Sequence, residues 1–221
     1  MKMPAWSYSS LTAFQTCPRR YYLTRVSKQV IEPQSEAMIY GNRVHEALEY
    51  RIKNGTPLPE GLEKYEVVAK TLEAAPVKWQ TETKFALTEA LEPTEFFAKN
   101  VWCRGIMDIH AVKGNLAVVA DYKTGKVRPE LSQLKLFAAA TFHKYPQVDT
   151  VQTLFLWLQN GTKFTEEVFH REQLDDIWEY FTPLISRMQV AYATDTWPPV
   201  PSGLCRKWCP VGTRLCEHCG S

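Results

Sequence analysis

A chain of 221 residues with 45% apolar and 23% charged residues is long enough to bury one sizeable core, and its composition is that of an ordinary globular protein. The formal net charge is only +2, so a nucleic-acid partner would have to be recognised by local patches and not by bulk charge. No apolar run is long enough to span a bilayer, and the first residues lack the apolar core of a signal peptide. These features predict a cytoplasmic protein with no membrane partner, in which six cysteines are metal ligands or plain thiols and not disulfides.

Helices are predicted first along the chain. Residues 7–10 supply N-cap candidates for a helix that runs to about residue 25. Apolar residues at helical spacing indicate a second helix over residues 37–52. Pro59 is expected to open a third helix that ends near residue 75. Residues 1–75 are therefore predicted to form a helical N-terminal part.

The centre of the chain is rich in predicted strands. Apolar patterning predicts strands over residues 79–89, 96–103, 105–112, 116–123, 148–159 and 162–170, with a type I′ turn at Asn160-Gly161. A helix over residues 129–145 is expected to cover the sheet, so residues 76–170 form the sheet with its helix. A last amphipathic helix over 174–193 gives a C-terminal part, 171–196. This order predicts an α/β fold with a central mixed β-sheet flanked by helices.

The amino-acid composition changes beyond Trp197, where prolines and glycine exclude regular secondary structure. Four of the six cysteines lie here, at Cys205, Cys209, Cys216 and Cys219. Residues 197–221 are therefore predicted to be a small Cys-rich appendage that packs back on the main domain and that a metal would hold together.

Two predicted strands each deliver an aspartate: Gly105-Ile106-Met107-Asp108, and then Ala120-Asp121-Tyr122-Lys123. Side chains alternate across a strand, so Asp121 and Lys123 point to the same side. Two carboxylates and an ammonium group can hold a divalent metal and a water beside a phosphodiester. The pattern predicts metal-dependent nucleic-acid hydrolysis. The alternative is that all three are solvated at strand ends, but an acid that ends a buried strand needs a partner or a metal.

His45 lies on the second predicted helix. A lone helical histidine is more often a packed or surface residue than a ligand. The company of the two aspartates makes it a candidate metal ligand.

Five motifs in order carry a resemblance to a known family. The opening stretch SYSSLTAFQTCPRRYY, residues 7–22, resembles the first motif of RecB- and AddB-type nuclease domains. Those domains belong to the PD-(D/E)XK nuclease superfamily, which also includes the CRISPR-associated adaptation nucleases. The other matches are Gly41, His45 and Leu48 to the helical histidine motif, Gly105 and Asp108 to Gly-x-x-Asp, Asp121-Tyr122-Lys123-Thr124-Gly125 to Asp-x-Lys-Thr-Gly, and Gln133 to the glutamine of the next helix.

The resemblance implies a restriction-endonuclease-like core over residues 1–196 with Mg²⁺ or Mn²⁺ bound. The implied metal ligands are His45, Asp108, Asp121 and the backbone carbonyl of Tyr122. Catalysis would rest on Lys123 together with Asp121 and Asp108, and Gln133 would position the DNA or the active site. Glu82 takes roughly the place of an acidic strand residue seen in relatives.

The same family often carries an iron–sulfur cluster, held by the cysteine of the opening motif and three C-terminal cysteines. Cys17, Cys205, Cys209 and Cys216 would hold a [4Fe–4S] cluster and join the two ends of the chain. Each C-terminal gap is one residue longer than the usual pattern, and Cys219 is an extra, alternative ligand. The four tail cysteines alone would suit Zn²⁺, with His218 to spare. With no metal, Cys17 would be a small buried residue and the tail loose.

Basic and aromatic residues near the motifs predict a groove that tracks a nucleic-acid backbone and stacks on its bases. The predicted DNA-binding residues are Arg19, Arg20, Tyr21, Lys126, Arg128 and Phe137. Phe137 stands where the family usually has tyrosine, so any role of a hydroxyl is lost, although the ring can still pack or stack.

Together these features predict a Mg²⁺- or Mn²⁺-dependent DNA exonuclease of recombination, repair or replication, of phage or mobile-element type. It would act on single-stranded DNA or duplex ends in the cytoplasm of a bacterium or a phage-infected host. The chain lacks a Walker A motif, so unwinding would need a separate helicase, and a single-strand-binding or recombination protein could be a further partner. The alternatives are a CRISPR adaptation nuclease and a catalytically silent, metal-stapled DNA-binding adaptor. A zinc-knot interaction protein with no DNA role would leave the acidic centre unexplained.

Overall fold

The computed structural model of the chain describes residues 1–127, 129–160 and 163–220. Their packing divides the chain into two compact units. One unit combines residues 1–34 with residues 179–221, and the other comprises residues 35–178. Within the described ranges, none of the helices has the length and apolarity that crossing a membrane requires.

The larger unit is built on one five-stranded sheet, ordered β1-β2-β3-β4-β5. Its strands are β1 Gln80–Leu87, β2 Cys103–Lys113, β3 Leu116–Lys123, β4 Thr150–Trp157 and β5 Phe164–His170. Strands β1, β2 and β3 are antiparallel, β3 and β4 are parallel, and β5 returns antiparallel to β4. The parallel pair needs a crossover, and helix α5, Ser132–Lys144, supplies it. The predicted mixed sheet is confirmed.

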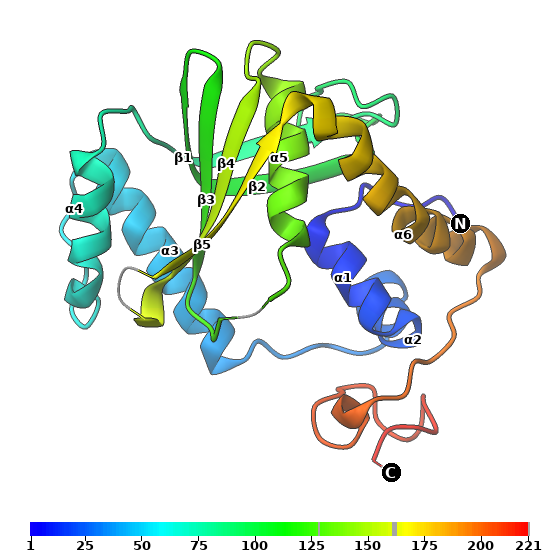
Figure 1. The fold of residues 1–221 in the computed structure, drawn as a ribbon. Coiled ribbons are helices and arrows are strands. Elements are labelled where there is room, and N and C mark those ends of the chain that lie inside the picture. The colour runs from blue at the N-terminus through cyan, green and yellow to red at the C-terminus, as the bar shows by residue number, and fades with distance from the viewer. Residues whose placement is uncertain (128, 161–162, 221) are drawn as a thin grey trace. The chain divides into compact units, whose positions relative to one another are not determined.

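Helices cover both faces of this sheet (Figure 1). Helices α3, Glu36–Asn54, and α4, Glu66–Ala74, lie on one face, and α5 lies on the other. Apolar side chains of α3 and α4 share a buried cluster with Ile109, Ala120 and Tyr122 of the sheet. Nine residues of α5 are buried, as expected for a helix that lies against a sheet over most of its circumference. The helices predicted over residues 37–52 and 129–145 are thus confirmed.

The first predicted helix is broken in the structure. Ser7 caps α1, Tyr8–Thr16, with its side chain, as the sequence predicts. Cys17 is extended (φ −166°, ψ 108°), and α2, Pro18–Tyr21, starts anew with proline in its first turn. A π-helical turn, Tyr22–Val26, follows. The prediction of one continuous helix to residue 25 was wrong because Pro18 lacks the N–H that continuation requires and suits a helix start.

Two further predicted boundaries differ. Helix α4 begins at Glu66 after a 3₁₀ turn, Glu63–Tyr65, and not at Pro59, because Gly61 is left-handed (φ +83°) and interrupts the segment. The strand predicted over residues 96–103 is a loop until Cys103. In that loop the adjacent Phe96 and Phe97 rings lie 5.0 Å apart between centroids, whereas neighbouring side chains of a strand point to opposite faces.

The predicted hairpin pairs β4 with β5, but its connection is longer than two residues. Strand β4 ends at Trp157 and is followed by a 3₁₀ turn, Leu158–Asn160. The predicted type I′ turn includes Gly161, which lies outside the described residues.

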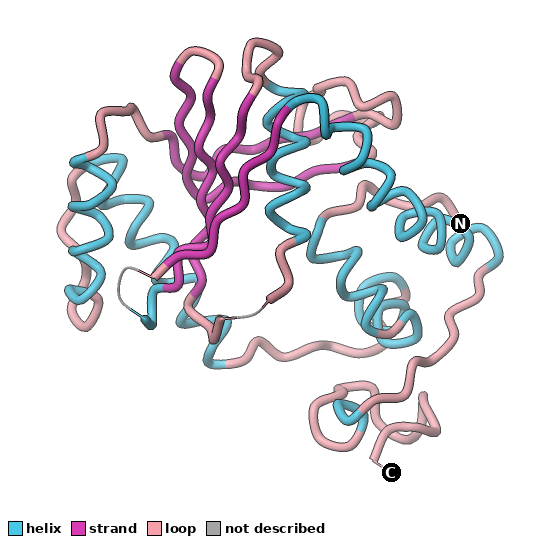
Figure 2. Tube along the Cα trace, in the orientation of Figure 1, coloured by secondary structure: helices cyan, strands magenta, loops and turns pink. Residues whose placement is uncertain are grey.

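The smaller unit ends in the cysteine-rich segment. Helix α6, Leu174–Thr194, leads into it, close to the bounds predicted from the sequence. Figure 2 shows the segment after α6 as loop apart from one 3₁₀ turn, Gly203–Cys205. The prolines and glycines thus exclude long regular elements here, as the sequence predicts.

Candidate active site

The two aspartates lie where the pairing of β2 with β3 ends, while β2 stays paired with β1. Strand β2 pairs with β3 only as far as Ile109 opposite Ala120, so Asp108 is the first residue beyond the ladder. Met107 contacts Thr141 of α5 on one face, whereas Ile109 joins the cluster of α3 and α4 on the other. Residues two apart normally share a face, so the strand twists sharply at Asp108.

The neighbouring strand is irregular at the same place. The ladder between β1 and β2 passes from Thr81–Ile109 to Thr83–Met107 and leaves out Glu82 and Asp108. Glu82 is left-handed, with φ +47°, which costs a residue with a Cβ about 1–2 kcal/mol. Such strain is typical of functional sites.

His45 connects helix α3 to strands β2 and β3. Its Nδ1 lies 3.2 Å from Asp108 Oδ2, and its Nε2 lies 2.9 Å from the carbonyl oxygen of Tyr122. The backbone N–H of Tyr122 donates to the same Asp108 oxygen at 2.8 Å. Three of the four metal ligands implied by the resemblance therefore form one hydrogen-bonded network.

A second network holds the remaining residues on the α5 face. Lys123 Nζ lies 2.5 Å from Asp121 Oδ2 and donates to Gln133 Oε1 at 2.8 Å. The amide of Gln133 donates in turn to Asp121 Oδ1 at 2.9 Å. Lys123 also lies over the ring of Phe155, 4.6 Å from its centroid. Gln133 thus fixes the carboxylate and the ammonium group relative to each other.

Burial and mutual repulsion raise the pKa values of the acidic side chains of the site. Burial, and then the charge of Asp108, raise the pKa of Asp121 to about 6 in spite of Lys123. Burial also raises the pKa of Glu82, and the charges of Asp108 and Glu49 add to the effect. Burial lowers the pKa of His45, but the hydrogen bond and charge of Asp108 outweigh it and leave that pKa raised. A bound cation would relieve this repulsion.

The donor set fits a hard divalent metal in its chemistry. Two carboxylates, one imidazole and one carbonyl suit Mg²⁺ or Mn²⁺. Across the described ranges, however, no three His, Cys, Asp or Glu side chains stand in metal-binding geometry. His45 instead bonds to the two oxygens that would be its co-ligands, and Lys123 pairs with Asp121. A metal would enter by opening these contacts.

The motif glycines let the elements of the site approach closely. A Cβ on Gly41 of α3 would lie 3.1 Å from Oγ1 of Thr124, the residue after Lys123. A Cβ on Gly105 would lie 2.6 Å from two ring carbons of Phe85. The first glycine brings the histidine helix against the end of β3, and the second makes room for Phe85 below β2.

Several predicted DNA-binding residues are engaged in the structure. Phe137 is 3% exposed and packs edge-on against Phe85, and Tyr21 is 4% exposed and bonds to Tyr192, so burial withdraws both rings from the surface. Arg19 donates to the carbonyls of Trp197 and Leu215, and Arg20 pairs with Glu32.

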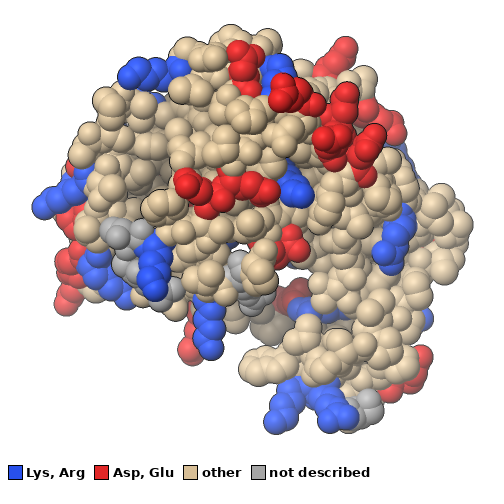
Figure 3. Space-filling model, viewed as in Figure 1, with Lys and Arg blue, Asp and Glu red and all other residues tan. Residues whose placement is uncertain are grey.

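Lys126 is exposed, and Arg128 lies outside the described residues. On the face shown in Figure 3, the described Lys and Arg side chains are spread among Asp and Glu and form no continuous belt. The distribution of charged side chains therefore does not indicate a DNA-binding path on this face.

Five cysteines line one small cavity in the smaller unit. They are Cys17, Cys205, Cys209, Cys216 and Cys219, and His218 lines the cavity with them. Backbone N–H groups of Arg20 and Val200 each point at Cys17 Sγ from 3.5 Å, and that of Ser202 points at Cys205 Sγ from 3.4 Å. Such donors are typical partners of metal-bound thiolates.

Among the described residues, the thiols of this cavity do not stand in metal-binding geometry. All six cysteines are free thiols. Burial, and then the nearby Cys209 and Cys216, raise the pKa of Cys219 to about 12. Cys216 and Cys219 also pack with Leu23 and Val211 in a small apolar cluster. The cavity therefore offers one more thiol than four-coordinate metal needs. Cys103 is fully buried in β2 and takes no part.

The sequence did not single out Phe155 as a site residue. It lies opposite Asp121 in the β3–β4 register, beneath the Lys123 ammonium group. The only sequence signal was an aromatic residue at an inward position of a buried strand.

Comparison with known proteins places these features in a family. The model of the PD-(D/E)XK nuclease superfamily matches residues 5–217. A solved structure from Eubacterium rectale, described as "Putative exonuclease", is 11% identical with a TM-score of 0.55 and covers 88% of this chain and 84% of its own. A structure described as SSO0001 is 13% identical with a TM-score of 0.48 and covers 99% and 88%. No curated protein matches the sequence.

Proposed function

This chain belongs to the PD-(D/E)XK nuclease superfamily, and from that premise we propose that it is a metal-dependent deoxyribonuclease that hydrolyses phosphodiester bonds. One observation carries the proposal. His45 of α3, Asp108 and the Tyr122 carbonyl form one network, and Asp121, Lys123 and Gln133 of α5 form another. All six residues were predicted from sequence motifs far apart in the chain.

In the proposed mechanism His45, Asp108, Asp121 and the Tyr122 carbonyl would hold Mg²⁺ or Mn²⁺. The ion would supply positive charge to the phosphate and lower the pKa of water. A water oxygen bonds to phosphorus in line with the bond that breaks, its proton passes to bulk solvent, and the leaving 3′ oxygen takes up a proton. The 5′-phosphate product is what the family resemblance implies.

Lys123 is the group that acts on the phosphate in this mechanism. Its ammonium group would stabilise the negative charge that builds up on the equatorial oxygens. Gln133 holds the lysine against Asp121, and the Phe155 ring below keeps water from that side. A positioned charge in a largely buried site acts more strongly than the same charge in water.

We assign exonuclease rather than endonuclease action, in recombination, repair or replication in a bacterial or phage-infected cytoplasm. The name of the Eubacterium rectale protein points the same way. A separate helicase, single-strand-binding or recombination protein would supply unwound DNA, because the chain has no Walker A motif. CRISPR adaptation is the alternative setting.

We further propose that Cys17, Cys205, Cys209 and Cys216 hold a [4Fe–4S] cluster, with Cys219 as alternative ligand and Zn²⁺ as alternative metal. The shared cavity and the N–H groups directed at Cys17 and Cys205 support this proposal. The metal would tie the nuclease domain, residues 1–196, to its appendage, residues 197–221. Anaerobically purified protein should be brown and should lose its colour in Cys209→Ser. Colourless protein that contains zinc would reverse the choice of metal.

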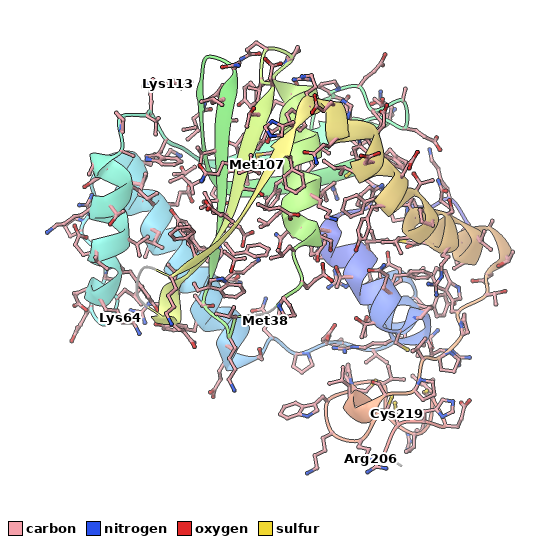
Figure 4. The ribbon with its side chains drawn as sticks, viewed as in Figure 1. Met38, Lys64, Met107, Lys113, Arg206 and Cys219 are labelled. Carbon is pink, nitrogen blue, oxygen red and sulfur yellow. The ribbon has the colours of Figure 1, made fainter. Side chains whose placement is uncertain are left out.

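A cleavage assay tests the nuclease proposal. End-labelled single- and double-stranded DNA is incubated with Mg²⁺ or Mn²⁺ and the wild type, Lys123→Ala, Asp121→Ala or the control Lys113→Ala. Figure 4 shows Lys113 at the β2–β3 turn, at the opposite end of the sheet from Met38 of α3. We expect the wild type and the control to cleave, and the first two variants to lose activity by at least about 100-fold. Unchanged cleavage by either would end the assignment.

One observation favours a second candidate function. The carboxylates that would bind the metal are paired with His45 and Lys123. Among the described residues, no three side chains stand in metal-binding geometry. A catalytically silent DNA-binding adaptor would keep such a site closed permanently. DNA binding without cleavage under every metal condition would select this candidate.

A further inference from the structure

Strands β1 and β2 continue beyond the active site as a two-stranded ribbon. Register pairs Lys84 with Ile106 and Ala86 with Arg104. The residues between them, Phe85 and Gly105, lie on the side of α5, where Phe85 packs against Phe137. Lys84, Arg104 and Ile106 therefore share the opposite face, and Lys84 and Ile106 are exposed there.

The loop between these strands adds two aromatic rings to that face. Phe96 and Phe97 meet edge to face, at 85° and 5.0 Å between centroids. Lys84 Nζ lies 5.4 and 5.6 Å from the two ring centroids, and Arg104 Cζ lies 5.2 and 6.0 Å from them. Both cations thus lie within cation–π distance of both rings.

This cluster is not a buried core. Phe97 is 78% exposed, the second most exposed of the large apolar side chains among the described residues. Within that part of the chain, neither Lys84 nor Arg104 has a carboxylate within ion-pair distance. An exposed ring beside two cations that are not held in ion pairs within the described residues is suited to a ligand that is both flat and negatively charged.

We infer that Phe96, Phe97, Lys84 and Arg104 form a subsite for single-stranded DNA, in which a base stacks on Phe97 and the cations bind the adjoining phosphates. The inference rests on the proposed nuclease function for its substrate. It also rests on continuity, because β2 runs directly from Arg104 through Ile106 to Asp108.

The strand sets the spacing between the subsite and the active site. Four residues of strand span about 13 Å at about 3.3 Å each. At about 3.4 Å per stacked nucleotide, that length corresponds to about four nucleotides or fewer. The base on Phe97 would therefore belong to the same DNA strand as the scissile phosphate, a few nucleotides away.

Binding without cleavage tests the subsite directly. Affinity for a fluorescent oligothymidylate is measured in EDTA for the wild type, Phe96→Ala and Phe97→Ala. The control is Tyr50→Ala, which removes an exposed ring from α3. We expect Kd to rise about 5- to 100-fold in the Phe97 variant, as for loss of one stacked base, and to stay unchanged in the control.

Salt dependence separates stacking from charge. Lys84→Ala and Arg104→Ala should each reduce the slope of log K against log salt by about 0.7, the value for one phosphate of a single strand. Lys113→Ala should leave the slope unchanged. Urea unfolding of Phe97→Ala should stay within about 0.5 kcal/mol of the wild type, because the side chain is 78% exposed, and so shows that the variant is folded.

Each failure has its own meaning. Unchanged oligothymidylate affinity in both phenylalanine variants, or an equal loss in Tyr50→Ala, would overturn the subsite and leave this face to a protein partner. A wild type that binds through Phe97 but cleaves nothing would overturn the proposed hydrolysis and leave the subsite standing.

Discussion

Replacing Asp121 by asparagine should make the protein more stable while it abolishes cleavage. Asp121 is 5% exposed, and burial with the charge of Asp108 raises its pKa from 3.8 to about 6. A change of that size disfavours the ionised carboxyl in the fold by about 3 kcal/mol. Asparagine removes the charge and keeps the shape, and its oxygen can still accept the hydrogen bond from Gln133. Lys123 loses its contact with the carboxylate but keeps its hydrogen bond to Gln133 Oε1.

The gain in stability should depend on pH with a defined sign. Between pH 3.8 and about 6 the folded protein binds more protons at Asp121 than the unfolded chain, so wild-type stability falls as pH rises through this window. The penalty is absent below it and complete above it. Asp121→Asn should therefore match the wild type near pH 3.8 and exceed it by up to about 3 kcal/mol near pH 7.

Urea unfolding in EDTA, followed by tryptophan fluorescence, measures this difference. Equal slopes against urea concentration are needed for the comparison. Glu60→Gln, which neutralises an exposed carboxylate, is the control and should stay within about 0.5 kcal/mol. Mg²⁺ should then stabilise the wild type more than the variant. A gain that does not change with pH, or one shared by the control, would refute this account of the buried carboxylate.

Four further results are expected. Gly105→Ala should cost about 1–3 kcal/mol in urea unfolding, and less in a Phe85→Leu background, because its Cβ would lie 2.6 Å from the Phe85 ring. Gln133→Ala should lower kcat about 10- to 100-fold in steady-state cleavage assays, with Kd for DNA unchanged, because Lys123 and Asp121 both lose the hydrogen bonds that position them. Cys219→Ser should leave the metal content unchanged by elemental analysis, whereas Cys17→Ser should abolish it; the reverse result would make Cys219 the ligand. The Mg²⁺ concentration for half-maximal cleavage should rise as pH falls through the raised pKa of His45, and this pH dependence should weaken in His45→Asn to the part that protonation of Asp121 causes.

Local signals predicted the elements that carry the site. Apolar patterning located α3, β2 and β3 to within a few residues. Helix α3 buries one face, so its apolar residues repeat with the helical period, whereas β3 is covered on both faces and reads as a continuous apolar run. The motifs on these elements, at His45, Asp108 and Asp121, were then brought together by the register of one sheet and one covering helix.

Features that depend on tertiary packing could not be predicted. The sharp twist at Asp108 arises where β2 leaves β3, and the opposite residue, Glu82, adopts a left-handed conformation that its type disfavours. Nothing in the neighbouring sequence marks either event. The sequence predicted a strand at Phe96 and Phe97, because propensity alone cannot separate two rings that meet edge to face in a loop from two alternating strand residues.

The closed active site has a simple electrostatic explanation. Each acidic ligand has a cation of the protein beside it: His45 beside Asp108, and Lys123 beside Asp121. These partners neutralise the carboxylates that a divalent ion would otherwise neutralise, and both ring nitrogens of His45 face acceptors, which favours the protonated imidazole. To bind a metal, His45 must lose a proton and turn a nitrogen from the Tyr122 carbonyl towards the ion. Lys123, released from Asp121, is then free to bind the phosphate, so metal entry and substrate recognition are coupled through the same two ion pairs. A permanently silent site would have no use for a lysine held by a glutamine at this distance, and that coupling is the physical reason to prefer the nuclease over the adaptor.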